Sequence, residues 1–598
     1  MKRLLAVTLS LLVIGALILS GCSQAIPRSY PTATQPTTQL PGTTQPITTI
    51  PSYSPTTTAP TATQPSSRPY PTAPPSVTLT VPPGVSGQTS LNTGNIGLST
   101  GGAKDVANFR ENILNNYLPL PTDVTFEGLF YDYYFDTGAT EPTDKLFSPS
   151  YSCAVTRDPL SLQTEYYLSV GLNSGLKESD FQRKKLNLVI VLDNSGSMGE
   201  SYTQYYYDQW GHTIDVYSDE GIVSQTKMSS AAESVVAILN QLESEDNFAV
   251  VEFNSNAYLV KPMGSVGRTD MNSIKNTILN INAGGSTNLA AGMTLATKQF
   301  NNLYELNNYE YENRIIILSD AQPNTGDFTA IGLFSMAEQN AVNRIYTTFI
   351  GIGVDFNSEL VEQITKIKGA NYYAVHSPRE FKQRVDEEFE YMVTPLVFNV
   401  QLSFQSRGWK IEQVFGSPEA DKASGNLMYI NTLFPSRSVE GENRGGLVLL
   451  KLSPISAYPG ELVYLKTSYE DRNGRTDGSS QVVDLGTNHL EFFPNSGIRK
   501  GVLLVRYAAL LQSWMIDERQ HLQFGQPWNP CVREDTGIIV PVIPNFSQWE
   551  RQSLPLAVSS PYKIIFEDFG RYFSSEMEAI RDISLGKELD ILNRLSKY

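Results

Sequence analysis

The sequence predicts an α/β protein with a doubly wound, mainly parallel sheet, followed by a β-rich second domain with a helical C-terminal tail. Between residues 184 and 393, near-continuous apolar segments such as LNLVIVLD (186–193) alternate with segments whose apolar residues recur at helical spacing. From residue 394 onward, apolar and polar residues alternate between turn signals, and helical spacing returns near the end. The first pattern is typical of parallel sheets with helices on both faces, and the second is typical of a β-sandwich or meander.

The first 22 residues predict export and a lipid anchor. Lys2 and Arg3 precede an apolar stretch at residues 4–19, followed by small residues and Cys22. This arrangement is typical of a signal peptide, and the stretch is short for a membrane span, which needs about 20 apolar residues. The ending LSGC resembles the bacterial lipoprotein signal, in which the cysteine is lipidated; the alternative is an ordinary secreted protein. We therefore expect an extracytoplasmic lipoprotein, anchored to the bacterial cell membrane through lipid on Cys22.

Residues 23–104 predict an extended, disordered stalk. Pro, Thr, Ser and Gln dominate up to about Gly84, and PTATQP occurs twice, at 31–36 and 60–65. Gly and Ser dominate from 85 to 104. Because such a composition cannot bury a core, we expect the stalk to hold a folded body away from the membrane.

The net charge of −16 argues against nucleic-acid binding, which needs a basic surface.

Besides Cys22, the chain has two cysteines, Cys153 and Cys531. In an oxidising compartment these two either form a disulfide or stay as free buried thiols, and the residues leave both alternatives open.

The apolar pattern also places the elements of each domain. A flanking segment, 105–183, has helical spacing at 105–118 and a strand pattern at 165–172. In the α/β domain, 184–393, the expected strands are 186–193, 247–254, 314–320, 345–353 and 371–375. The expected helices are 227–242, 288–300, 357–369 and 377–392, the last opened by Ser377 as N-cap and Pro378 at the first helical position. The β-rich domain with its helical tail covers 394–598.

Polar residues follow two of these strands at the point where each strand ends. Two strands end in aspartate, one of them begins a turn with two serines at alternate positions, and a glycine-rich loop, NAGGSTN, carries a threonine just before a helix. Ligands of a doubly wound sheet bind at the carboxyl ends of its strands, so we expect these side chains to meet at one rim. The set is Asp193, Ser195, Ser197, Thr287 and Asp320.

Hydroxyls and carboxylates without imidazole or thiolate indicate a hard-cation site. Mg²⁺ fits this chemistry best, with Mn²⁺ or Ca²⁺ as alternatives. Neutral hydroxyl ligands leave the ion a strong Lewis acid with a free position, which an acidic group of a partner would fill. For the DNSGS turn alone, the alternative is a set of short side chains that cap backbone groups.

Three separated segments, DNSGSM, GGSTNL and LSDAQPNTG, resemble the metal-ion-dependent adhesion site of von Willebrand factor A domains. The resemblance covers residues 184–392. It implies that Ser195, Ser197 and Thr287 bind the metal directly, and that Asp193 and Asp320 bind it directly or through water. Two departures are Ala321, where the family often has glycine, and a Tyr-rich insertion at 200–226, which we expect beside the metal rim.

The flanks, NNYLPLPTDVTFEGLFYDYYFD and LVFNVQLSFQSRGWKIEQVFG, resemble those of bacterial YfbK-like lipoproteins. That family wraps its flanking segments around the A domain. The resemblance implies that Cys153 and Cys531 come within reach of each other.

The predicted function is Mg²⁺-dependent binding of a protein partner that exposes an Asp or Glu, displayed on the cell surface and without enzymatic activity. The alternatives are a metal-dependent hydrolase or envelope assembly factor, and a purely structural envelope lipoprotein. Ser195 lacks the GxSxG elbow of a nucleophile, and none of the four histidines stands in triad or zinc-ligand spacing. These are His212, His376, His489 and His521.

Overall fold

The computed structural model describes most of the chain beyond residue 93. The described residues are 94–213, 225–301, 309–420, 427–455, 462–485, 491–522, 531–532, 539–540 and 547–598. The chain divides into two units, 1–81 and 82–598, and all described residues belong to the second. The predicted signal peptide, Cys22, the stalk through residue 93 and His489 lie outside them. None of the described helices is long and apolar enough to cross a membrane.

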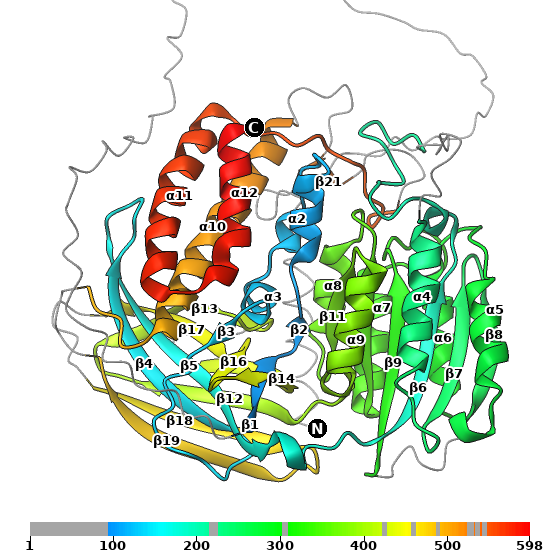
Figure 1. Ribbon diagram of the computed structural model, residues 1–598, viewed down its shortest axis with the longest axis horizontal. Coiled ribbons are helices and arrows are strands. Elements are labelled where there is room, and N and C mark those ends of the chain that lie inside the picture. Colours follow the sequence, from blue (N-terminus) through cyan, green and yellow to red (C-terminus); the bar gives the residue numbers. More distant parts are fainter. Residues whose placement is uncertain are drawn as a thin grey trace, which may run out of the picture. The chain divides into compact units, whose positions relative to one another are not determined.

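The α/β domain is built on a seven-stranded mixed sheet (Figure 1). In spatial order its strands are β2 (Gly102–Ala103), β11 (Asn371–Val375), β10 (Ile345–Ile352), β9 (Tyr311–Ser319), β6 (Lys185–Asp193), β7 (Asn247–Phe253) and β8 (Ala257–Ser265). Neighbours from β2 to β7 are parallel, and β7 and β8 are antiparallel. The interior position of β6, between β9 and β7, explains its continuous apolar sequence, because both of its faces are buried.

Helices cover both faces of this sheet. On one face α4 (Lys227–Leu239), α5 (Met271–Leu279) and α9 (Pro378–Val393) pack against the even-numbered apolar residues of β6. On the other, α6 (Leu289–Lys298), α7 (Ala330–Val342) and α8 (Ser358–Thr365) pack against Val189 and Val191. Ser377 is the N-cap of α9, with Pro378 in its first turn, as the sequence predicts.

Three elements of this domain were not predicted: β8, α5 and α7. β8 is an edge strand with mixed exposure, so it lacks a clear apolar alternation. α5 buries Ile278 alone among its residues, and α7 buries Leu333, Ala337 and Asn340. An edge strand and helices that bury few residues leave little apolar pattern in the sequence, because few of their side chains contact the core.

The β-rich domain is an antiparallel sheet assembled from both flanks of the α/β domain. Its spatial order is β13 (Trp409–Phe415), β17 (Leu447–Pro454), β5 (Thr164–Lys177), β1 (Asn95–Thr100), β14 (Leu427–Ser436), β12 (Val397–Gln405), β18 (Leu462–Asp471) and β19 (Thr476–Asp484), with β4 (Ser148–Arg157) on β5. Smaller sheets join β3 (Tyr134–Phe135), β15 (Ser438–Val439) and β16 (Glu442–Arg444), and pair β20 (Cys531–Val532) with β21 (Ile539–Val540). The α/β domain is therefore inserted between β5 and β12.

The predicted disorder up to residue 104 is wrong for residues 95–103. They form β1, which lies between β5 and β14, and β2, which extends the α/β sheet. The small residues in this segment, which led to the prediction of disorder, allow the strands to pack closely against their neighbours. A β-carbon on Gly97 would lie 2.8 Å from Ser436 Oγ and 2.9 Å from Asn443, so the strand needs glycine there.

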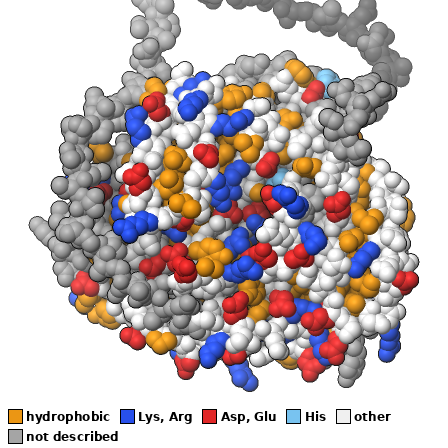
Figure 2. Space-filling view, in the orientation of Figure 1, with side chains coloured by type: hydrophobic (Ala, Val, Ile, Leu, Met, Phe, Trp, Pro, Cys, Tyr) orange, Lys and Arg blue, Asp and Glu red, His pale blue; other side chains and the backbone are white. Residues whose placement is uncertain are grey.

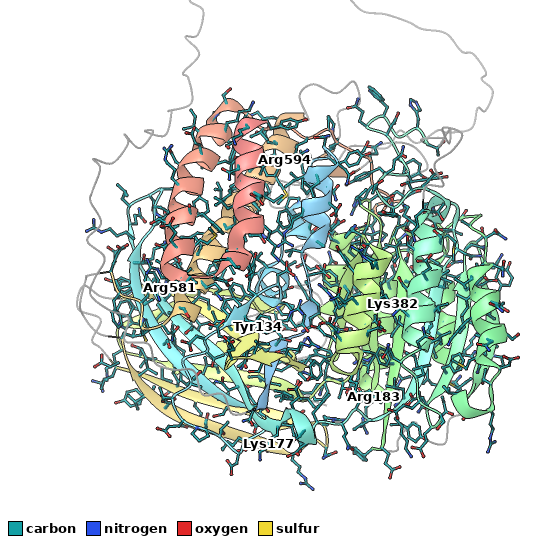
Figure 3. The ribbon with its side chains drawn as sticks, in the orientation of Figure 1. Tyr134, Lys177, Arg183, Lys382, Arg581 and Arg594 are labelled. Carbon is teal, nitrogen blue, oxygen red and sulfur yellow. The ribbon has the colours of Figure 1, made fainter. Side chains whose placement is uncertain are left out.

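Helices from both ends of unit 82–598 share one core. It joins α2 (Ala107–Leu114) and α3 (Phe126–Tyr131) to α10 (Ser496–Leu522), α11 (Ser560–Ile580) and α12 (Gly586–Lys597). Buried Glu588 on α12 accepts hydrogen bonds from the hydroxyls of Tyr133 (2.6 Å) and Tyr507 (2.8 Å). Arg594, labelled in Figure 3, donates to Leu114 O and Asn116 Oδ1 at 3.2 and 2.9 Å, which fixes α12 to the end of α2.

The disulfide between Cys153 and Cys531 that the YfbK resemblance suggests stays a prediction. The Cys153 thiol on β4 is half-buried, and burial raises its pKa to about 12. The side chain of Cys531 lies outside the described residues.

On the face drawn in Figure 2, described Lys and Arg side chains are interspersed with Asp and Glu rather than gathered in one basic stripe.

Candidate metal centre

The three predicted segments meet at the carboxyl edge of the α/β sheet. β6 and β9 are parallel neighbours, with Leu192 opposite Leu318, so Asp193 and Asp320 emerge side by side. After Asp193 the chain turns into a short helix, Gly196–Gly199. Two backbone bonds join this turn to the glycine-rich loop: Gly196 N donates to Gly285 O at 2.9 Å, and Gly284 N donates to Asn194 O at 2.8 Å.

The predicted ligand side chains are all buried at this edge. Their exposed fractions are 0% for Asp193, 1% for Ser195, 8% for Ser197, 3% for Thr287 and 0% for Asp320. Ser195 Oγ and Ser197 Oγ are 3.3 Å apart. Thr287 is held from the other side, because its N–H donates to Asn324 Oδ1 (2.9 Å) and its carbonyl accepts from Asn324 N (3.0 Å).

The two carboxylates are close enough to interact. Burial, and next the negative charge of Asp320, raise the pKa of Asp193 to about 7. Asp193 Oδ1 accepts from Ser195 N (2.9 Å) and Oδ2 accepts from Ser319 Oγ (2.5 Å). Asp320 Oδ1 is buried, and no described group donates a hydrogen bond to it. Two buried carboxylates with one orphan oxygen favour a cation at this position.

The donor chemistry fits a hard divalent ion. Three hydroxyls, the Asp193 carboxylate and the orphan oxygen of Asp320 would hold Mg²⁺, and no imidazole or thiolate stands among them. Within the described ranges no cluster of three or more His, Cys, Asp or Glu side chains is arranged to hold a metal. The site differs from such clusters because most of its donors are hydroxyls.

Comparison with known proteins places these residues in a domain family. Residues 188–322 match the von Willebrand factor type A domain family. The chain contains a von Willebrand factor A domain. Domains of this kind generally mediate metal-dependent protein interactions. The resemblance of the flanks to YfbK-like lipoproteins stays a prediction.

The relatives differ widely in length from this chain. Inter-alpha-trypsin inhibitor heavy chain H2 of Mesocricetus auratus is 24% identical over 221 residues, which is 36% of this chain and 21% of that one. Heavy chain H4 of Homo sapiens is 22% identical over 249 residues, or 38% of this chain and 26% of that one. The chain thus spans about a fifth of the length of the first curated relatives it matches.

Two solved structures are similar to parts of this chain at TM-scores below 0.5. A von Willebrand factor type A protein from Catenulispora acidiphila has 13% identity and a TM-score of 0.42, covering 65% of this chain and 84% of that one. The ArnB paralog VWA2 from Sulfolobus acidocaldarius has 12% identity and a TM-score of 0.33, covering 76% and 97%.

A lysine that sequence reasoning did not select reaches into the candidate metal site. Lys227 begins α4, and its fully buried Nζ lies 3.0 Å from Asp320 Oδ2 and 2.7 Å from Asp355 Oδ2. Burial alone would lower the pKa of Lys227, but the charges of Asp355 and Asp320 outweigh burial and raise it. A lysine in the first turn of a helix opposes the helix dipole, and this mismatch is the signal that could have identified it.

Asp355 is the second residue that was missed. It follows β10, the third parallel strand whose carboxyl end reaches this edge, and it is 1% exposed. Besides Lys227, it accepts from Gln322 Nε2 (3.1 Å) and from Tyr206 N (3.2 Å). An acidic residue just after an apolar strand is the same signal that identified Asp193 and Asp320.

The described part of the Tyr-rich insertion lies at the rim, as expected. The Tyr206 hydroxyl is 3.9 Å from the position that a β-carbon on Gly196 would take, so it lies over the turn that follows β6. Tyr205 donates to Asn112 Oδ1 (2.9 Å) and Tyr207 donates to Glu550 Oε1 (2.7 Å). Residues 214–224 of the insertion lie outside the described residues.

The described histidines occupy other places. His212 is exposed, with Nδ1 3.4 Å from Asp208. His521 Nδ1 is 2.7 Å from the carbonyl of Asp517 on its own helix. His376 buries both ring nitrogens without hydrogen-bond partners, and burial lowers its pKa to about 4.

Proposed function

We propose that this protein binds a protein partner through Mg²⁺ held by Asp193, Ser195, Ser197, Thr287 and Asp320. An exposed Asp or Glu of the partner would complete the metal's shell. One observation carries the proposal: a buried set of carboxylate and hydroxyl oxygens that includes an orphan oxygen of Asp320. The A domain supports it, because proteins of this class generally use such interactions.

The proposal includes the location of the protein. Export, lipidation of Cys22 and the stalk would display the domain outside the cytoplasm on the cell envelope. Mn²⁺ or Ca²⁺ would serve as alternatives to Mg²⁺, because both accept oxygen ligands.

The experiment is affinity capture from envelope extracts with the full chain as bait. Wild type and Ser195→Ala are compared in Mg²⁺ and in EDTA, and Ser575→Ala, at an exposed site on α11, is the matched control. We expect one set of proteins to be retained by wild type and control in Mg²⁺, and lost with EDTA or Ser195→Ala. Capture that survives both treatments would contradict the proposal, and metal-dependent turnover of a captured substrate would favour the hydrolase instead.

A further inference from the structure

A segment from near the C-terminal end of the chain crosses the rim of the metal site. We call residues 547–552 the rim segment. Ser547 Oγ donates to Pro323 O (2.5 Å), Trp549 Nε1 donates to Phe328 O (2.7 Å), and Arg551 N donates to Gln322 Oε1 (2.9 Å). All three acceptors belong to the loop that follows β9 and begins at Asp320. The rim segment is therefore attached to the same loop that supplies a predicted metal ligand.

The rim segment is packed into the domain rather than laid on its surface. Trp549 is 4% exposed and belongs to the core under α6, α7 and α8. Its carbonyl accepts from Asn357 Nδ2 at 2.8 Å. The Arg551 guanidinium, 5% exposed at its side chain, contacts Glu359 at 2.7 Å. Buried anchors on both sides of residue 550 fix the position of Glu550.

Glu550 holds a buried carboxylate among neutral donors. Only 3% of the residue is exposed. Oε1 accepts from the Tyr207 hydroxyl (2.7 Å) and Asn324 Nδ2 (3.0 Å), and Oε2 accepts from Ser547 N (2.6 Å). A buried carboxylate is costly to desolvate, and all three of these hydrogen-bond donors are neutral. A cation nearby would stabilise it.

A single side chain connects Glu550 to the metal site. Asn324 donates to Glu550 through Nδ2, and its Oδ1 accepts the N–H of Thr287 at 2.9 Å. Tyr207, whose hydroxyl donates to Glu550, packs its ring on that of Tyr206, with the ring centroids 4.7 Å apart. Tyr206 in turn lies over the turn that would bind the metal. Glu550 is thus held at the rim by neighbours of Thr287 and Gly196.

We propose that Glu550 is a built-in acidic ligand, which takes the free position of the metal until an acidic residue of a partner displaces it. The inference rests on the proposed function, because it needs a metal at the site. It adds that the free protein is closed by its own rim segment and by Tyr206. A partner must then offer a carboxylate that competes with Glu550, together with a surface that replaces the contacts of the rim segment.

The test counts the water molecules bound to the metal. Mn²⁺ is the probe, and its affinity and bound water are measured by water-proton relaxation on the full chain. The variants are wild type, Glu550→Gln and, as a matched control, Glu567→Gln at an exposed site on α11. Loss of the carboxylate should admit an additional water to the ion and weaken Mn²⁺ binding on the order of tenfold. The control should match wild type.

Two outcomes separate this inference from the proposed function. If wild type binds Mn²⁺ and Glu550→Gln has the same affinity and bound water, Glu550 is not a ligand and the inference falls alone. If wild type binds no Mn²⁺, both proposals fall.

Hydrogen exchange on the wild-type chain gives a second measurement that needs no variant. Adding Mg²⁺ should slow exchange at amides 548–552 as well as in the turn 193–197. Protection confined to the turn would overturn the inference, even if Glu550→Gln fails to fold.

Discussion

The Nζ of Lys227 lies 3.0 Å from Oδ2 of Asp320, and both side chains are fully buried. The same ammonium lies 2.7 Å from Asp355 Oδ2, so one resident cation bridges two acids. Lys227 thus contacts one oxygen of Asp320, and no described group donates a hydrogen bond to the other, Oδ1. Under the proposed function, Oδ1 is the oxygen of Asp320 that would bind the divalent ion.

Replacing Lys227 with methionine should destabilise the metal-free protein and increase its response to Mg²⁺. Breaking a buried ion pair leaves uncompensated charge and costs about 3–5 kcal/mol. Mg²⁺ would restore part of this loss by neutralising Asp320. Chemical denaturation with and without Mg²⁺ measures both effects. Lys275→Met, a half-buried lysine on α5 away from the site, is the control; equal losses in the two variants would contradict the prediction.

Asp193→Ala should abolish thermal stabilisation by Mg²⁺. A ligand that binds only the folded state stabilises it by about 2.7 kcal/mol at 100 times its dissociation constant. Without the Asp193 carboxylate, that contribution should be lost. Melting curves of wild type, Asp193→Ala and the exposed-site control Asp590→Ala check this. An unchanged Mg²⁺ shift in Asp193→Ala would exclude Asp193 as a ligand.

Mg²⁺ affinity should fall as the pH drops below 7. The folded-state pKa of Asp193 is raised to about 7 by burial and by Asp320, and only the deprotonated carboxylate binds a metal. Each pH unit below this value should weaken binding by up to about tenfold. The stability of the metal-free protein depends on pH in the opposite direction. The contribution of the Asp193 carboxyl to the free energy of unfolding is present below about pH 4 and is lost as the pH rises through 7.

Calorimetric titration with Mg²⁺ between pH 8 and pH 6 measures this dependence, together with the protons released. Affinity that is constant across this range would show that Asp193 is already ionised. Asp193→Asn in the metal-free protein should remove the loss of stability toward high pH.

His376 should destabilise the protein in weak acid. Its folded-state pKa is lowered by burial to about 4 from 6.5, so the unfolded chain binds its proton more readily. Stability is therefore full above pH 6.5 and is lost as the pH falls toward 4, by up to about 3 kcal/mol. His376→Leu should flatten the pH dependence of the unfolding free energy in this range. His521→Leu, at an exposed position, should leave it unchanged.

The local sequence was sufficient to predict those strands that are buried on both faces. β6 and β9 are buried on both faces, so their apolar runs predicted strands and placed Asp193 and Asp320 at strand ends. The glycine-rich loop placed Thr287 for the same reason, since it precedes an amphipathic helix. β8 and α7 contact the core through few residues and left no such pattern.

The sequence by itself determined an α/β domain, the positions of its main strands along the chain and the oxygen-rich residues at their ends, because these depend on short-range pattern. The tertiary structure alone decided that residues 95–103 form strands, that both flanks build one sheet, that Lys227 pairs with Asp355, and that Glu550 contacts Asn324. Asn324 and Glu550 are 226 positions apart, and Lys227 and Asp355 are 128 apart. Such contacts follow from how whole elements pack together, and no periodicity along the chain records them.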